Sequence, residues 1–89
     1  LCEVWIAQRD PQRARLPCGR ALDLHEVGRA PARRRGRARF AHARYQWIAG
    51  EADEARRAAA LARDELIEAG GLGARDLEAL RSWLDEHGR

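Results

Sequence analysis

Arginine and large apolar side chains recur in the segment 31–49, mainly at intervals of three or four residues, so an α-helix would place them on one face. They are Arg33, Arg37, Phe40, Arg44, Trp47 and Ile48. A guanidinium binds a carboxylate through two parallel hydrogen bonds and also stacks over aromatic rings. This face therefore suits an acidic, partly apolar peptide or a terminal carboxylate. The structural alternative is that Phe40 and Trp47 are ordinary packing residues between helices.

The stretch Arg33–Arg39 reads RRRGRAR, with five arginines in seven residues. Such a cluster can contact nucleic-acid phosphates, and binding of that kind weakens steeply with salt. On a helix, however, these side chains point in different directions, and the acids of residues 51–54 follow closely. A solvated or salt-bridged face is therefore the alternative to a nucleic-acid surface.

Groups suited to catalysis or metal binding are scarce. Ser82 is the only serine, threonine is absent, and the histidines at positions 25, 42 and 87 do not combine with the cysteines at any zinc-site spacing. The sequence GGLG at 70–73 lacks the Lys-Ser/Thr of a phosphate loop and indicates a helix stop. We predict no enzymatic activity, no cofactor and no metal, and we expect Cys2 and Cys18 to be buried thiols.

Charge is divided unevenly along the 89 residues, whose net charge is +3. Residues 1–50 hold 11 arginines and 4 acids, whereas residues 51–89 hold 6 arginines and 10 acids. This asymmetry indicates an anionic partner for the first half or stacking of one half on the other. No apolar run approaches the roughly 20 residues of a membrane span, so we expect a soluble, cytoplasmic protein. The start at LCEVWI, without Met, predicts a piece of a longer chain with missing neighbours.

Helix-forming residues dominate and no strand pattern occurs, which predicts an all-α fold. Glycine and proline divide the chain into about five helices, at 1–8, 11–27, 31–49, 52–69 and 74–87. Asp10 is placed to cap the second helix, and Pro17 predicts a kink or a late helix start. The third helix has two apolar faces and should lie between neighbours, whereas the fifth has one. Trp83 either covers the edge of the core or mediates self-association.

A weak internal repeat is present. When the sequence is aligned with itself so that Ala14 matches Ala55, the same offset also matches Ala21 with Ala62 and Asp23 with Asp64. We call the offset between Ala14 and Ala55 the repeat shift. A shift that is one position longer then pairs Leu24 with Leu66 and Gly28 with Gly70. Each copy would be a helix hairpin, and hairpins that cannot bury their faces alone stack into solenoids.

The sequence from Phe40 to Ala62 resembles a tetratricopeptide repeat, because Ala43, Gly50-Glu51, Ala55 and Ala62 occupy the small-residue and turn positions of that family in order. The resemblance implies antiparallel helix hairpins stacked as a short α-solenoid: a truncated repeat at 1–28, a full hairpin at 31–69 and a capping helix at 74–87. Long-spaced variants are similar to repeat regions of large bacterial signalling proteins.

A scaffold of this kind implies protein–protein interaction. The first helix of the full repeat would line a concave groove, and the six residues Arg33 to Ile48 named above would face a protein or acidic peptide in it. The alternative function is a small basic nucleic-acid-binding domain that uses Arg33–Arg39. An exposed repeat edge carrying Trp5 also predicts a homodimer.

Overall fold

The computed structural model describes residues 2–27 and 30–87, without the side chains of residues 22–27. These residues form five α-helices and one 3-10 turn, and no strand lies among them, which confirms the predicted all-α class. The elements are α1 (Cys2–Ala7), α2 (Pro11–Val27), α3 (Ala32–Ile48), α4 (Ala52–Glu68), η1 (Gly70–Gly73) and α5 (Ala74–His87). The helix stop predicted at Gly28 lies outside the described residues.

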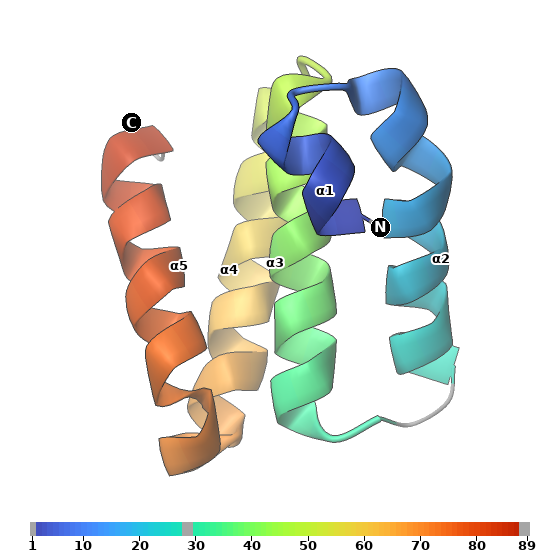
Figure 1. The fold of residues 1–89 in the computed structure, drawn as a ribbon. Helices are drawn as coiled ribbons and strands as arrows, with labels where there is room; N and C mark the ends of the chain where they lie inside the picture. Colours follow the sequence, from blue (N-terminus) through green and yellow to red (C-terminus); the bar gives the residue numbers. More distant parts are fainter. Residues whose placement is uncertain (1, 28–29, 88–89) are drawn as a thin grey trace.

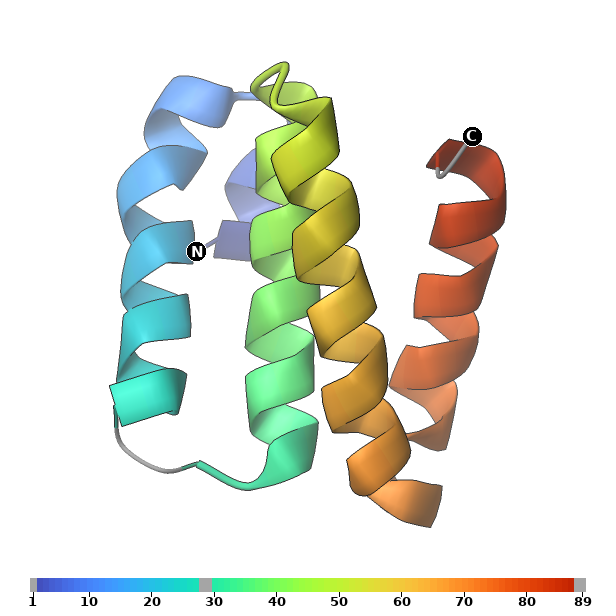
Figure 2. The ribbon, with the colours of Figure 1, turned by 180° about the vertical axis from the view of Figure 1, so that it is seen from behind.

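The long helices α2, α3 and α4 stand side by side, with α3 in the middle (Figure 1). Helix α1 packs on both α2 and α3 but reaches over only their upper part, and α5 packs against α4 on the other side (Figures 1 and 2). The third helix is thus enclosed by neighbours, as its two apolar faces predict.

The start of α2 follows the predicted cap. The backbone N–H of Arg13 donates to Oδ1 of Asp10 at 3.1 Å, which satisfies one of the free N–H groups of the first turn. Helix α2 begins at Pro11 and continues through Pro17, so the alternative of a late helix start is wrong. No backbone hydrogen bond is lost at Pro11, because an N–H at the first helical position has no partner within the helix.

The turns that join α1 to α2 and α3 to α4 have the same backbone hydrogen bonds. The N–H of Arg9 donates to Ile6 O at 2.9 Å, as Gly50 does to Trp47 O at 3.1 Å. The N–H of the next residue donates to the carbonyl oxygen five positions back at 2.9 Å in both turns. Both Arg9 and Gly50 have positive φ, 54° and 86°. The repeat shift aligns these two turns and also maps the bounds of α2 onto those of α4.

The buried side chains form two clusters. One joins α3, α4 and α5 through Phe40, Ala43, Ala59, Ala62, Leu66 and Leu80. The other joins α1, α2 and α3 through Cys2, Ile6, Ala14, Cys18 and Ala41. Small residues allow the close approach of α3 and α4: a Cβ at Gly36 would lie 2.7 Å from the side chain of Leu66.

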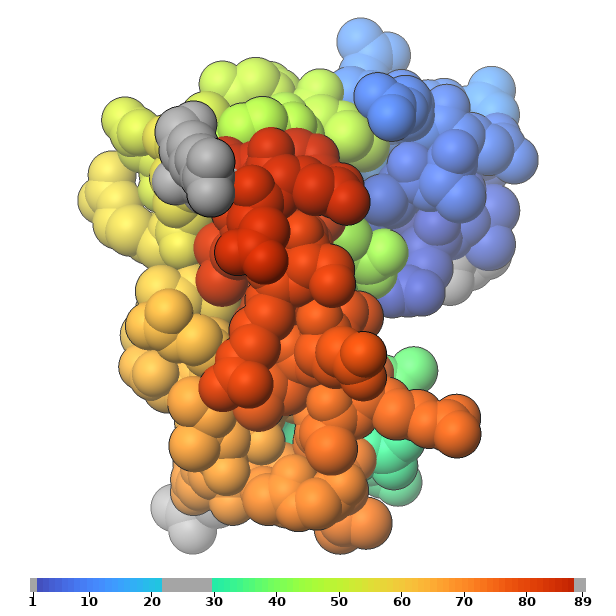
Figure 3. Space-filling model, turned by 90° about the vertical axis from the view of Figure 1, so that its left-hand side faces the viewer, coloured from blue at the N-terminus to red at the C-terminus, as the bar shows by residue number. Residues whose placement is uncertain are grey.

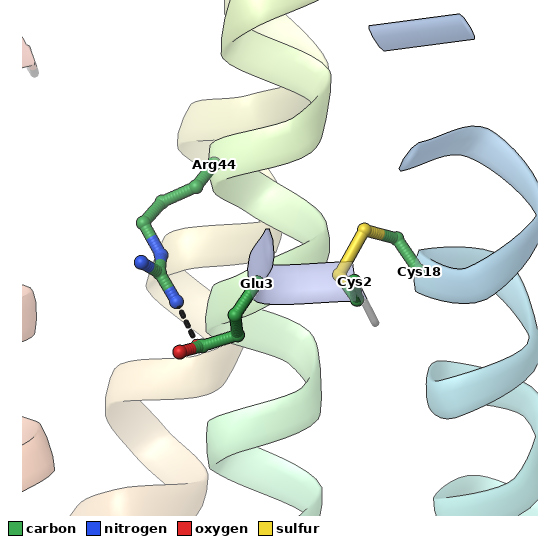
Figure 4. Close-up of a disulfide and its surroundings, with 4 residues drawn as sticks. All are labelled: Cys2, Glu3, Cys18 and Arg44. Carbon is green, nitrogen blue, oxygen red and sulfur yellow. Dashed lines mark hydrogen bonds and ion pairs between the residues drawn. A yellow bond between two sulfur atoms is a disulfide. The ribbon is translucent and has the colours of Figure 1, made fainter. Parts of the chain in front are cut away.

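The two cysteines are not thiols. Cys2 and Cys18 form a disulfide that joins α1 to α2 across a separation of 16 residues (Figure 4). The expectation of buried thiols is therefore wrong, although both residues are buried, at 7% and 0% exposure. Two cysteines are too few for a disulfide scaffold, but only the packing of the hairpin brings these two together, with Cα atoms 4.7 Å apart.

Candidate functional site

The aromatic residues of the predicted binding face pack against α5. Phe40 is 9% exposed and lies 6.0 Å, ring to ring, from Trp83. Trp47 lies 5.8 Å from Trp83 and 4.9 Å from His87. These contacts agree with the packing interpretation of Phe40 and Trp47, and they place Trp83 at the edge of the core. Figure 3 shows α5 lying over this side of the molecule.

The other members of the predicted face are divided between the two flanking helices. Ile48 packs against the cluster of α1 and α2. Arg44 forms an ion pair with Glu3 of α1 (Figure 4). Its guanidinium also lies 4.7 Å from the ring centre of Phe40. Arg33 and Arg37 each lie 3.6 Å from a carboxylate oxygen of Asp76 at the start of α5. The residues of this face therefore contact α1 or α5, while Arg33 and Arg37 remain exposed to solvent.

The arginine run of α3 is largely paired with acids of the second half of the chain. Arg35 lies 3.5 Å from carboxylate oxygens of both Glu65 and Glu68. Arg39 is hydrogen-bonded to Glu65, and the side chains of this pair are only 16% and 12% exposed. A partly buried pair of this kind is screened less by salt than an exposed one. Stacking of the basic half on the acidic half thus accounts for much of the charge asymmetry.

A hollow of the described surface lies next to the start of α1, between α2 and α3. It is a cavity of about 650 Å³. Helix α1 contributes its first residues to the upper wall, and the lower parts of α2 and α3 continue beyond it (Figure 1). We call this the α2–α3 cleft, and its lining residues are Cys2, Glu3, Leu16, Pro17, Arg20, Ala21, Arg34, Arg37, Ala38 and Ala41.

Apolar groups and arginines occupy different parts of the cleft. Ala38 and Ala41 are 7% and 6% exposed and form its floor on α3, while Leu16 of α2 is 68% exposed at its lip. An apolar side chain that entered the cleft would remove part of Leu16 from water, whereas Ala38 and Ala41 are already almost fully buried. Burial of apolar surface contributes about 25 cal/mol per Å².

The charge of the cleft is positive. Three arginines line it, and Glu3 is the acid among the lining residues. Arg37 and Glu3 are paired with Asp76 and Arg44 respectively. Arg20 and Arg34, both exposed, form no ion pair with any residue that the structure describes. These two guanidiniums, on opposite walls of the cleft, are available to a carboxylate.

Of the residues that line this cleft, the sequence predicted Arg37 as a binding residue but not Leu16, Arg20 or Arg34. A helical pattern shows which side chains share one face of one helix, but not which part of that face a neighbouring helix covers. Only the packing of α1, α2 and α3 decides this.

Among the described residues, no group of three or more His, Cys, Asp or Glu side chains is arranged to hold a metal ion. No helix of the described part of the chain has the length and apolar character needed to cross a membrane.

Comparison with known proteins gives no assignment. No protein-family model matches the sequence, and neither a curated protein nor a solved structure matches it significantly. The function must therefore be argued from the residues and their arrangement.

Proposed function

We propose that this chain is a protein-interaction module that binds an acidic, partly apolar segment of a partner in the α2–α3 cleft. The observation that carries the proposal is the combination of an apolar floor with Arg20 and Arg34 on opposite walls. An apolar side chain of the partner would enter the hollow, and neighbouring carboxylates would meet the guanidiniums.

The arrangement of the helices supports a repeat scaffold of the tetratricopeptide kind. The α1–α2 and α3–α4 hairpins have matching turns and second helices of 17 residues. Ala14 and Cys18 of α2 are fully buried, as are Ala55 and Ala59, their equivalents under the repeat shift. Scaffolds built from stacked hairpins usually function as binding surfaces.

The nucleic-acid alternative is less well supported. Arg33, Arg35, Arg37 and Arg39 all pair with carboxylates of α4 or α5, and these carboxylates would repel a phosphate backbone. Phosphate binding needs several arginines on one surface that are free of acids.

Fluorescence anisotropy tests the two functions together. A labelled peptide that contains leucines between glutamates and a labelled DNA duplex are each titrated with the oxidised chain at about 50 and 200 mM salt. We expect saturable peptide binding, weaker at the higher salt because the arginines are exposed, and no tight duplex binding. Duplex binding that exceeds peptide binding would reverse the assignment.

Charge-reversal variants of the cleft arginines test whether the peptide binds in the α2–α3 cleft. Arg20→Glu and Arg34→Glu should each weaken peptide binding by about fivefold, because an attraction at the rim becomes a repulsion. Arg15→Glu, also on α2, and Arg57→Glu, on α4, are matched controls: both arginines are exposed and lie outside the cleft. Equal losses in the controls would show attraction by net charge and not by this site.

The disulfide also indicates the kind of cellular compartment in which the protein resides. Disulfides persist in oxidising surroundings and are rare in the cytoplasm. We therefore propose an oxidising compartment in place of the cytoplasmic location expected from the sequence. Trapping the thiols of the native protein with an alkylating reagent at the moment of lysis tests this: modified Cys2 and Cys18 would contradict it.

A further inference from the structure

The disulfide and the α2–α3 cleft share a residue. Cys2 forms the disulfide with Cys18 and is also one of the residues that line the cleft. Cys18 is not one of the lining residues, and its exposed fraction is 0%, whereas that of Cys2 is 7%. A reagent that enters the cleft therefore meets the sulfur of Cys2 first. Access decides which sulfur of a disulfide is attacked.

The disulfide also fixes part of the wall of the cleft. It attaches the start of α1 to α2, and the next residue, Glu3, lines the cleft as well (Figure 4). Glu3 pairs with Arg44, so the start of α1 is linked both to α2 and to α3. Ile6, further along α1, lies in a buried cluster with Ala14 and Ala41. Cleavage of the bond should therefore loosen the cleft end of α1, while the apolar contacts of Ile6 hold the rest.

Cleavage of the bond is a thiol–disulfide exchange with a dithiol, which supplies the two electrons. One thiolate of the dithiol attacks Sγ of Cys2, a mixed disulfide forms there, and Cys18 leaves as a thiolate. The second thiolate of the dithiol attacks the reductant's own sulfur in the mixed disulfide and releases the thiolate of Cys2. Both cysteines take up the protons that the dithiol has lost. The products are two cysteine thiols and the oxidised, disulfide form of the reductant.

We infer that the disulfide regulates the cleft: the oxidised chain binds the acidic segment, and reduction by a dithiol weakens this binding because Cys2 and Glu3 lose their fixed position. This inference rests on the proposed function and adds the regulation of the same site. A segment that occupies the cleft also covers Cys2, so binding and reduction oppose each other. Because the two equilibria are linked, each changes the other by the same factor.

The peptide affinity of the two redox forms tests the regulation. The labelled peptide with leucines between glutamates is titrated by anisotropy against the oxidised chain and against the chain reduced with excess dithiothreitol. Reduction should weaken binding by about tenfold, which is within the usual range of coupling between two sites. The double variant Cys2→Ala and Cys18→Ala should bind as weakly as the reduced chain, and dithiothreitol should not change its affinity.

A second measurement needs no variant. The fraction of reduced chain is determined over a range of ratios of reduced to oxidised dithiothreitol, without peptide and with enough peptide to saturate both redox forms. The ratio at which half of the chain is reduced should rise in the presence of peptide by the same factor, about tenfold. A peptide with lysine in place of glutamate is the control and should leave this ratio unchanged.

The possible results distinguish the regulation from the proposed function. Equal or tighter binding by the reduced chain would overturn the regulation and leave the binding of an acidic segment intact. Absence of binding by the oxidised chain would remove the proposed function, and the regulation with it. Circular dichroism of the reduced chain should show that most of its helix remains. Complete unfolding on reduction would show that the disulfide supports the whole fold, and would overturn a regulation confined to the cleft.

Discussion

The α1–α2 and α3–α4 hairpins have the same turn and the same second-helix length, yet they are stabilised differently. In α3–α4 a first helix of 17 residues packs along its partner through Gly36, Phe40 and Leu66, and α5 covers the result. In α1–α2 a disulfide joins Cys2 of the first helix to Cys18 of the second, beside the buried Ile6 and Ala14. The first hairpin thus has a covalent link between its helices in addition to apolar packing.

The two hairpins also differ in how much of the second helix is covered. The face of α4 that packs on α3 is buried in the core. On α2, Leu16, Pro17, Arg20 and Ala21 line the α2–α3 cleft. Four sets of substitutions test whether the two hairpins differ in the way that their contacts indicate.

The largest effect should come from Leu66→Ala. Leu66 is fully buried where α3, α4 and α5 meet, so truncation leaves a cavity and should lower the free energy of unfolding by about 3 kcal/mol or more. Thermal unfolding followed by circular dichroism measures the loss. Leu61→Ala, with a side chain that is 52% exposed, should cost far less. Similar losses for both would mean that Leu66 is not the centre of this core.

Removal of the disulfide should lower the free energy of unfolding by a similar amount, but the structural change should be confined to one part of the molecule. The double substitution Cys2→Ala and Cys18→Ala opens a loop of 16 residues, which corresponds to about 3 kcal/mol. Hydrogen exchange should show loss of protection in α1 while α3 and α4 remain protected. Uniform loss across all helices would show that the two hairpins do not differ in the way proposed.

Two helical glycines should respond with opposite signs. Gly36→Ala places a Cβ 2.7 Å from Leu66, and we expect a loss of about 1–2 kcal/mol from overpacking. Gly19→Ala in α2 meets no atom within 4 Å and should increase stability by up to about 1 kcal/mol, since alanine restricts the unfolded chain. Urea titration of both variants gives the sign directly. A gain at Gly36 would contradict the close packing of α3 on α4.

The smallest effect concerns the two helix starts. Asp10 caps α2, whereas Glu51, at the equivalent position before α4, makes no side-chain cap bond. Asp10→Ala should therefore lower the free energy of unfolding by about 1 kcal/mol, and Glu51→Ala by only a few tenths of a kcal/mol. Chemical denaturation resolves the difference. Equal costs would indicate that the first-turn contacts are not what distinguishes these positions.

Much of the fold was predictable because its signals are local. Asp10-Pro11, Gly50 and the glycines at 70–73 end or begin helices through backbone conformations and caps, which depend on a few neighbouring residues. The all-α class and the helix bounds follow. The left-handed conformation of Arg9 was harder to foresee, since glycine is the usual residue there and only the matching turn at Gly50 indicates it.

The candidate site was predicted less well. Arg33, Arg37, Phe40 and Arg44 were predicted to face a partner, but each of them contacts α1 or α5 of the same chain. The expectation of an exposed Trp5 also needs correction, because it is half-buried against the α1–α2 cluster with Arg13 over its ring. Which face of a helix is covered depends on contacts between residues far apart in the sequence.

By itself the sequence determined where the helices begin and end, the internal repeat and the division of charge between the halves. Capping, backbone freedom and apolar periodicity act within a few residues, so these properties can be deduced from the order of amino acids. Only the tertiary structure decided that Cys2 meets Cys18, that α5 packs against Phe40 and Trp47, and that Arg20 and Arg34 line the same cleft. Those relations depend on the lengths and packing of whole helices, which bring together side chains that no local pattern connects.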